Sequence, residues 1–268
     1  MRILFIGDIV GNPGVNIVRR ALPLLIARER LDLVIANAEN AAAGSGITQR
    51  LYRRLQEAGV DLFTLGDHIY KKSEIIETLR TDPRVCKPAN FPAQAPGRLF
   101  AHTRARNGVE VAVFTVLGRT FMRAVDCPFT ACDVVLAELQ GRFPIIICDL
   151  HAEATADKYL LAHHLRGRVS AALGTHTHVP TADEQILSPG TAFICDVGMT
   201  GPYDSVLGRR VDRVLHTSIT FEPTAFEVAE GDVRLCGAIL EVEETTGRAT
   251  HIERFRFDES DLPPSADS

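Results

Sequence analysis

Runs of apolar residues alternate with stretches of helical spacing through the first third of the chain. The runs predict buried strands, over residues 2–7, 31–36 and 61–65. The stretches of helical spacing predict helices, over residues 15–30, 48–58 and 74–80. Thr48 and Ser73 are expected to cap the second and third helices, and Gly59 to end the second. This alternation indicates a parallel sheet with helices on its faces.

The alternation continues through the middle of the chain and then gives way to strands alone. Further strands are predicted over residues 109–117, 143–148, 169–173 and 191–196, with helices near 130–140 and over 155–166. The last stretch is typical of antiparallel strands, over 224–230, 233–243 and 248–257, with Gly231-Asp232 as a hairpin turn. We expect one α/β domain with mixed sheets over residues 1–258, followed by a flexible tail over 259–268.

Composition narrows the class of protein. The chain has 268 residues, of which 46% are hydrophobic and 24% charged, as in an ordinary globular protein. Its formal net charge of −5 argues against a dedicated binder of long nucleic acid, which needs a basic face. No apolar run has the length of a signal peptide or a membrane span, so we expect a cytoplasmic protein without a membrane partner. The six cysteines form no C-x-x-C pair and are expected to be reduced and mostly buried.

Side chains able to bind metal ions follow five of the predicted strands. They are Asp8, the segment Asn37 to Asn40, Asp67-His68, the segment Asp149 to His151, and His176 with His178. The carboxyl ends of parallel strands meet at one edge of a sheet, where ligands bind. Each group alone has a structural explanation, such as a turn or a hydrogen-bonded histidine. The five together indicate a metal or catalytic site.

The mixture of carboxylate, amide and imidazole groups, without a cysteine cluster, favours manganese, iron or zinc. The candidate ligands are too many for one ion: Asp8, Glu39, Asn40, Asp67, His151, His176 and His178. Two ions sharing a bridging carboxylate would use them all and could clamp a phosphoryl group. His68, beside Asp67, is either a further ligand or a general acid for the leaving oxygen. His176 and His178 are expected to point the same way from an extended segment.

These motifs resemble those of the calcineurin-like metallophosphoesterases. The matching residues are Gly7-Asp8, Glu39-Asn40, Gly66-Asp67-His68, Asp149-Leu150-His151 and Gly174 to His178. Longer strings resemble one branch of them, the YmdB-type phosphodiesterases: GDIVG at 7–11, NAENAAAGSGIT at 37–48, DLHAEATADK at 149–158 and GTHTHVPTAD at 174–183. The resemblance runs from residue 2 to about residue 220.

The resemblance implies a four-layer α/β/β/α sandwich with mixed sheets and a dinuclear metal centre, often of iron. It implies hydrolysis of phosphodiesters, with 2′,3′-cyclic nucleotides such as 2′,3′-cAMP as the best-supported substrates; RNA ends stay open as a further class. It is also compatible with a homo-oligomer. By the same resemblance Asp8, Glu39, Asn40 and His178 hold one metal, and Glu39, Asp67, His151 and His176 the other. A hydroxide held by the metals would attack phosphorus, and His68 would protonate the departing ribose oxygen.

The chain departs from the superfamily pattern at two positions. Many metallophosphoesterases carry a histidine two residues after the first aspartate, where this chain has Val10. The third motif usually reads G-N-H, and here it is Gly66-Asp67-His68. The additional negative charge should tighten cation binding and weaken the attraction for an anionic substrate.

Two alternatives come from other classes of protein. A dinucleotide-binding dehydrogenase would use Gly7, Gly11 and Gly14, but their G-x-x-x-G-x-x-G spacing differs from the G-x-G-x-x-G fingerprint. A regulatory protein could keep the metal site and act by binding a nucleotide or an RNA end. His68 favours an enzyme over this second alternative, because a protein that only binds needs no proton donor.

Overall fold

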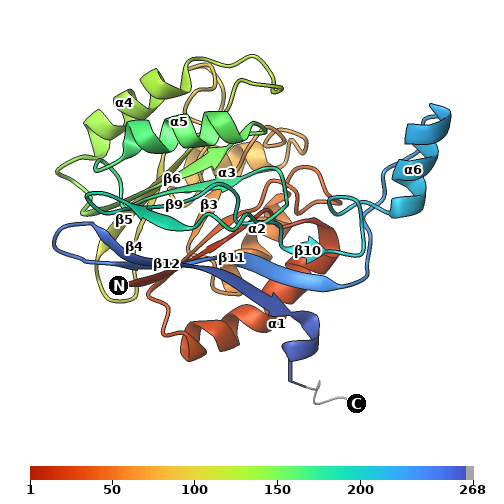
Figure 1. Ribbon diagram of the computed structural model, residues 1–268, viewed down its shortest axis with the longest axis horizontal. Coiled ribbons are helices and arrows are strands. Elements are labelled where there is room, and N and C mark those ends of the chain that lie inside the picture. Colours follow the sequence, from red (N-terminus) through yellow and green to blue (C-terminus); the bar gives the residue numbers. More distant parts are fainter. Residues whose placement is uncertain (264–268) are drawn as a thin grey trace.

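The structure is a computed structural model, which describes residues 1–263. Two six-stranded mixed sheets lie face to face, and helices cover the outer face of each (Figure 1). These are the four layers that the motif resemblance implies. Three clusters of buried side chains fill the three spaces between the layers.

The first sheet is built mainly from the two ends of the chain. Its strands are β1 (Arg2–Ile6), β2 (Leu33–Asn37), β3 (Leu62–Thr64), β10 (Gly201–Pro202), β11 (Val233–Val242) and β12 (Ala249–Asp258). β1, β2 and β3 run parallel, and β11 pairs with β1 in the antiparallel direction. The carboxyl ends of β1, β2 and β3 therefore lie along one edge of the sheet.

The second sheet comes from the middle of the chain. Its strands are β4 (Ala101–Arg104), β5 (Glu110–Leu117), β6 (Ile145–His151), β7 (Ala171–Thr175), β8 (Gln185–Leu187) and β9 (Thr191–Ile194). The central four, β5, β6, β7 and β9, are parallel, and the short strands β4 and β8 pair antiparallel at the two edges. β6 extends three residues beyond the predicted strand, so Asp149 and His151 lie inside it.

The helices fall on the outer faces as their apolar spacing predicts. α1 (Gly11–Arg28), α2 (Gln49–Glu57) and α3 (Ile75–Thr81) pack against the first sheet; α4 (Pro128–Leu139) and α5 (Thr155–Leu165) pack against the second. Thr48 caps α2, as predicted, by accepting a hydrogen bond from Leu51 N at 3.3 Å. The predicted cap at Ser73 is wrong, because α3 begins after Glu74 and has no side-chain cap.

The C-terminal third differs from the prediction in its turn. Residues 224–230 form no strand, so Gly231-Asp232 is not a hairpin turn; it leads directly into β11. The hairpin of this region joins β11 to β12 through residues 243–248. Of the expected tail, Glu259–Asp261 form a short 3-10 helix, and Glu259 pairs with Arg20 at 3.0 Å. Residues 264–268 lie outside the described part of the chain.

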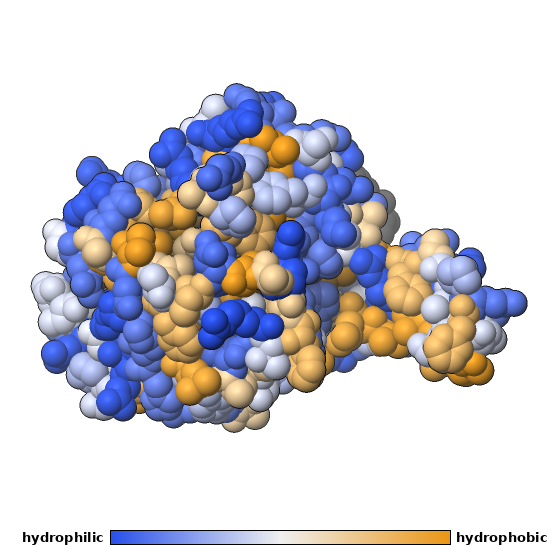
Figure 2. Space-filling view, turned by 90° about the horizontal axis from the view of Figure 1, so that it is seen from above, coloured by the Kyte–Doolittle hydropathy of each residue, from blue (hydrophilic) through white to orange (hydrophobic). Residues whose placement is uncertain are grey.

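A helical arm, residues 211–224, projects from the body of the molecule and carries α6 (Val211–Thr220) (Figure 1). The segments on either side of it contact the body, as Leu207 does at His178 and Val228 at Gly11. The sequence analysis missed α6, although Val211, Leu215 and Ile219 recur at four-residue intervals. The helix has no buried residue, and Ile219 is 74% exposed. Figure 2 shows apolar side chains on the arm and beside it.

The six cysteines are all free, and five of them are buried. Within residues 1–263, no helix combines the length and the apolar content that crossing a bilayer requires.

Candidate metal centre

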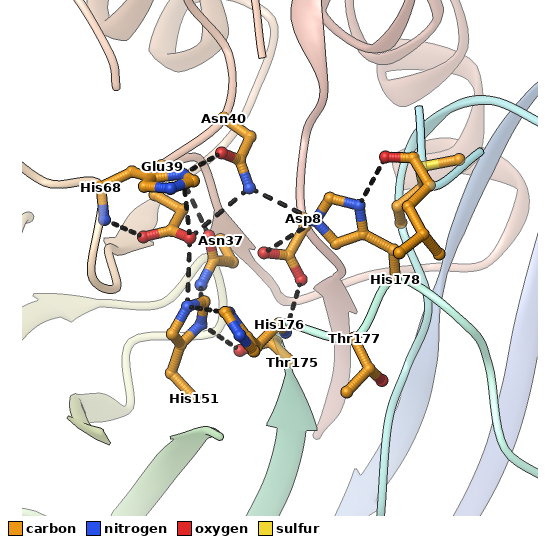
Figure 3. A network of polar contacts seen from close by, with 12 residues as sticks. Asp8, Asn37, Glu39, Asn40, His68, His151, Thr175, His176, Thr177 and His178 are labelled. Atoms are coloured by element: carbon orange, nitrogen blue, oxygen red, sulfur yellow. Dashed lines mark hydrogen bonds and ion pairs between the residues drawn. The ribbon is translucent and has the colours of Figure 1, made fainter. Parts of the chain in front are cut away.

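The predicted site residues gather where strand ends of the two sheets face each other. Asp8 follows β1, Glu39 and Asn40 follow β2, and Asp67 with His68 follows β3. His151 ends β6 in the second sheet, and His176 and His178 lie just after β7. Figure 3 labels all of these side chains except Asp67 and shows them turned toward a common space between the two sheets.

Four of these residues form a tight cluster, with one possible ligand atom from each lying within 4.8 Å of the others: Glu39, Asp67, His151 and His176. His151 Nε2 is at the centre of the cluster. It lies 3.1 Å from Glu39 Oε1 and 3.3 Å from Asp67 Oδ1. His176 Nδ1 is 3.1 Å from the same nitrogen. Such a set of carboxylate and imidazole groups is suited to a first-row transition metal.

The charges of this cluster call for a cation. Burial opposes a charge on the His151 imidazole, but the carboxylates of Glu39 and Asp67 hold its pKa well above the usual value. Burial likewise opposes ionisation of Glu39 and Asp67, yet His151 holds the pKa of each carboxyl below its ordinary value. Burial, followed by the charge of His151, lowers the pKa of His176 to about 4. A proton on His151 therefore supplies positive charge where a metal ion would supply it, and metal binding must release that proton.

Asp8, Asn40 and His178 lie beside the cluster. His178 Nε2 is 3.8 Å from Asp8 Oδ1 and 3.3 Å from Asn40 Nδ2. Asp8 Oδ2 accepts a hydrogen bond from His176 N at 3.0 Å, whereas the buried Oδ1 has no hydrogen-bond partner among the residues that the structure describes. Burial raises the pKa of Asp8 to about 6, against the opposing charges of His178 and His151. A buried carboxylate oxygen without a donor is suited to a cation.

Each of the three histidines has its remaining ring nitrogen held by the protein. His151 Nδ1 is 2.8 Å from Thr175 Oγ1. His176 Nε2 is 3.2 Å from Glu153 Oε2, and His178 Nδ1 donates to the carbonyl oxygen of Leu207 at 3.1 Å. Contacts of this kind fix the tautomer and the orientation of metal-binding histidines. The nitrogens left to face the common space are Nε2 of His151, Nδ1 of His176 and Nε2 of His178.

The loop that carries His176 and His178 is not extended, which corrects the expectation that both side chains point the same way. Their φ angles are +91° and +66°, in the left-handed region that non-glycine residues rarely adopt. His176 therefore faces His151, while His178 faces Asp8. Between them, Thr177 donates to Asp196 from both its backbone nitrogen and its hydroxyl, at 3.1 and 2.6 Å.

Asp196, which Thr177 contacts, also forms an ion pair with Lys158, and this pair supports the histidine loop. Lys158 Nζ lies 2.7 Å from Asp196 Oδ2, and both side chains are fully buried. A buried pair that loses one member leaves an uncompensated charge, which costs several kcal/mol. The fold thus maintains the strained histidine loop through α5 and the segment after β9, neither of which carries a candidate ligand.

His68 lies at the mouth of the site, and its side chain is about one-third exposed. Its Nδ1 is 2.7 Å from Asn40 Oδ1, and its Nε2 is 3.7 Å from Asp67 Oδ2. Its backbone nitrogen donates to Glu39 Oε2 at 3.0 Å. The ring therefore lies outside the four-residue cluster, on the partly exposed side of the site, where a ligand of the cluster could contact it.

Gly66 packs so closely against the cluster that there is no room for a side chain at this position. A methyl group at this position would overlap His151 Nε2 and come within 2.5 Å of Glu39 Oε2. We expect Gly66→Ala to displace both side chains and to lower the metal content of the purified protein to below half that of the wild type. Elemental analysis measures this, with circular dichroism as the control for folding. A folded Gly66→Ala protein with wild-type metal content would show that the two side chains do not need this position.

Sequence reasoning missed the residues that support the site. Thr64, Thr175 and Glu153 were not singled out, and Asn37 and Asp149 appeared only as members of strand-end groups. Thr64 ends β3 three residues before Asp67, and Thr175 ends β7 directly before His176. This position at a strand end is the one signal that could have pointed to them. No sequence signal could have pointed to Leu207, because it contributes its backbone carbonyl group, which every residue has.

Comparisons with known proteins identify the family of the chain and proteins with a similar fold. The family model described as YmdB-like protein matches residues 4–255. A 2′,3′-cyclic-nucleotide 2′-phosphodiesterase of Bacillus subtilis (strain 168) is 43% identical, over 98% of this chain and 99% of the relative. A solved structure of a novel phosphatase from Mycoplasma pneumoniae has a TM-score of 0.89 at 29% identity, covering 96% of this chain and 93% of that one. The calcineurin-like phosphoesterase YfkN of Bacillus subtilis shares the fold, with a TM-score of 0.54 at 14% identity over 96% and 90% of the two chains.

Proposed function

The chain belongs to the family of YmdB-like proteins, and from this premise we propose that it hydrolyses 2′,3′-cyclic nucleotides at a dinuclear metal centre. The observation that carries the proposal is the cluster of Glu39, Asp67, His151 and His176 at the ends of strands from both sheets. A regulatory protein that acts by binding alone is not favoured. The relatives that align along nearly the whole chain are named as a phosphodiesterase and a phosphatase.

We propose two groups of ligands that share one carboxylate. Glu39, Asp67, His151 and His176 would hold one metal ion; Asp8, Glu39, Asn40 and His178 would hold the other. The unpartnered Oδ1 of Asp8 supports the second group. Glu39 is the fitting bridge, because Oε1 lies 3.1 Å from His151 Nε2 and 3.5 Å from Asn40 Nδ2, one member of each group.

Asn40 would serve as an oxygen ligand through the second lone pair of its amide oxygen. In the structure that oxygen accepts from His68 Nδ1, and the amide nitrogen faces Glu39 and His178. The contact keeps a hydrogen on His68 Nδ1. We propose that His68 gives its proton from Nε2 as the imidazolium and is left as the neutral ring, with its remaining hydrogen on Nδ1.

Two bound metal ions would supply positive charge for the phosphodiester and lower the pKa of a water molecule between them. The chain's own part is to place the proton donor. His68 Nε2 faces Asp67 across 3.7 Å at the open side of the cluster. We propose that it protonates the ribose oxygen as the bond from phosphorus to that oxygen breaks. Its backbone contact with Glu39 couples the position of the donor to that of the bridging carboxylate.

A product assay tests the substrate. The protein loaded with Mn²⁺ is expected to convert 2′,3′-cAMP into 3′-AMP, because the relative from B. subtilis is named for the bond to the 2′ oxygen. Chromatography separates 3′-AMP from 2′-AMP, and the same protein with excess chelator is the control. Cleavage of bis-p-nitrophenyl phosphate without cleavage of 2′,3′-cAMP would reject this substrate and keep the phosphodiesterase. Failure to cleave either ester with Mn²⁺, Fe²⁺ or Zn²⁺ would reject both the substrate and the phosphodiesterase activity.

The metal we propose is iron, with manganese or zinc as the substitutes the site accepts. Carboxylate, amide and imidazole donors suit all three, and their supply in the cell decides among them. Three further parts of the proposal rest on the sequence: RNA ends as a second substrate class, a cytoplasmic location and self-association. The apolar side chains of the arm, which include Leu215, Ile219 and Phe221, are the surface on which we place self-association.

A further inference from the structure

Asp149 is a fully buried carboxylate directly beneath the candidate metal centre, and within residues 1–263 no cationic side chain is bonded to it. It accepts three hydrogen bonds instead: from Asn37 Nδ2 at 3.1 Å, Thr64 Oγ1 at 2.5 Å and Thr175 Oγ1 at 2.6 Å. Burying a carboxylate costs free energy even when it is hydrogen-bonded, so the place of Asp149 in the core calls for an explanation.

The three donors come from both sheets. Asn37 and Thr64 end β2 and β3 of the first sheet, whereas Asp149 and Thr175 belong to β6 and β7 of the second. The carboxylate therefore connects the two sheets at the level where the candidate ligands leave the strands. Of the two threonines, only Thr175 also contacts a candidate ligand, His151.

The hydrogen count at Thr175 fixes the tautomer of His151. The hydroxyl has one hydrogen, and the short bond to Asp149 Oδ1 takes it, because an ionised carboxylate only accepts. The oxygen of Thr175 can then only accept from His151 Nδ1, which lies 2.8 Å away and must carry a hydrogen. Neutral His151 thus presents the lone pair of Nε2 to Glu39 and Asp67, where the metal belongs.

A competing contact exists and makes the assignment testable. Asn37 Nδ2 lies 3.4 Å from His151 Nδ1 and could donate to it, which would leave the hydrogen on Nε2 and close the site to a metal. Two shorter contacts favour a hydrogen on His151 Nδ1 instead. Asn37 Nδ2 lies closer to Asp149 Oδ2, at 3.1 Å, and His151 Nδ1 lies closer to Thr175 Oγ1, at 2.8 Å.

We propose that Thr175 is a positioning residue, which Asp149 orients so that it holds His151 with Nε2 toward the metal. The inference rests on the proposed metal centre and extends it with two residues that touch neither metal nor substrate. Hydroxyl, carboxylate and imidazole form a relay of the kind in which loss of an outer partner typically weakens metal binding about 10- to 100-fold.

Two matched variants separate positioning from stability. Thr175→Val and Thr64→Val remove the same hydroxyl from two buried strand-end threonines, and both deprive Asp149 of a donor. Both should lower Tm. Only Thr175→Val should weaken Zn²⁺ binding, by about 10- to 100-fold in competition with a chromophoric chelator, and Thr175→Ser should restore it. Equal Zn²⁺ affinity in the two valine variants would overturn the proposal.

A second measurement needs no variant and decides the matter if Thr175→Val does not fold. Nitrogen-15 NMR of the wild-type protein loaded with Zn²⁺, which is diamagnetic, reports the state of each His151 ring nitrogen. We expect a hydrogen on Nδ1 and the metal on Nε2; the reverse would overturn the proposal. Neither measurement uses a nucleotide. The inference can therefore hold even if 2′,3′-cAMP is not the substrate, and it can fail even if the protein hydrolyses 2′,3′-cAMP.

Discussion

Glu39→Gln is expected to reduce the metal content from about two ions per chain to one or none and to lower turnover on the order of 10³-fold or more, as loss of a catalytic group does. The change keeps the shape of the side chain and removes its charge. Glu39 is fully buried and lies 3.1 Å from His151 Nε2. It also accepts the backbone hydrogen bond of His68. The neutral amide can serve one ion with its oxygen, but its nitrogen cannot be a ligand for the other.

Asp67→Asn is the matched control for this variant, because it makes the same change on a carboxylate proposed to serve only one ion. Asp67 is partly exposed, and the calcineurin-like motif that Gly66-Asp67-His68 resembles usually has asparagine in its place. We expect Asp67→Asn to retain both ions, more weakly bound. Elemental analysis of both proteins, purified without chelator, gives the result. Two ions in Glu39→Gln with full activity would remove Glu39 from the role of bridge.

His68→Ala is expected to lower turnover of 2′,3′-cAMP about 10²- to 10⁴-fold, the range for loss of a general acid, while leaving the metal content near that of the wild type. The reason for the second expectation is geometric. The ring of His68 lies outside the four-residue cluster, and its closest contact is with the amide oxygen of Asn40. A loss of metal in His68→Ala would instead make His68 a ligand.

A comparison of two leaving groups tests whether His68 acts as a proton donor. A ribose oxygen needs a proton to depart, whereas p-nitrophenolate departs as a stable anion. The loss of activity in His68→Ala should therefore be much smaller on bis-p-nitrophenyl phosphate than on 2′,3′-cAMP. An exposed histidine of α5, His163, provides the control variant His163→Ala, for which no change is expected. Equal losses on both esters would mean that His68 acts by position or binding and not as an acid.

The parallel strands and the meeting of their carboxyl ends could be predicted from the sequence pattern, whereas the four layers were implied by the motif resemblance. Strand and helix alternate with short connections, so the strands are parallel and their carboxyl ends share an edge. That rule brings Glu39 and Asp67 together within one sheet. It does not say how the two sheets face each other. The sequence analysis applied the rule to all five strands as if they formed one sheet, but His151 and His176 follow strands of the second sheet. They reach Glu39 because the two sheets face each other, which only the motif resemblance implied.

What could not be predicted depends on backbone conformation and on contacts between sheets. The period-two rule failed for His176 and His178 because both residues adopt positive φ, and the buried pair of Lys158 and Asp196 maintains that loop. Thr175 looks like any strand-end threonine until the structure places it between Asp149 and His151. The helix of the arm was missed for another reason, since its apolar spacing was present in the sequence and was not used.

The measurement that tests the central claim most directly is elemental analysis of protein purified without chelator, combined with an assay of 2′,3′-cAMP hydrolysis on the same sample. The account predicts about two transition-metal ions per chain, with iron foremost, and production of 3′-AMP that excess chelator abolishes. A protein that retains no metal and shows no hydrolysis after reconstitution with Fe²⁺, Mn²⁺ or Zn²⁺ would contradict it.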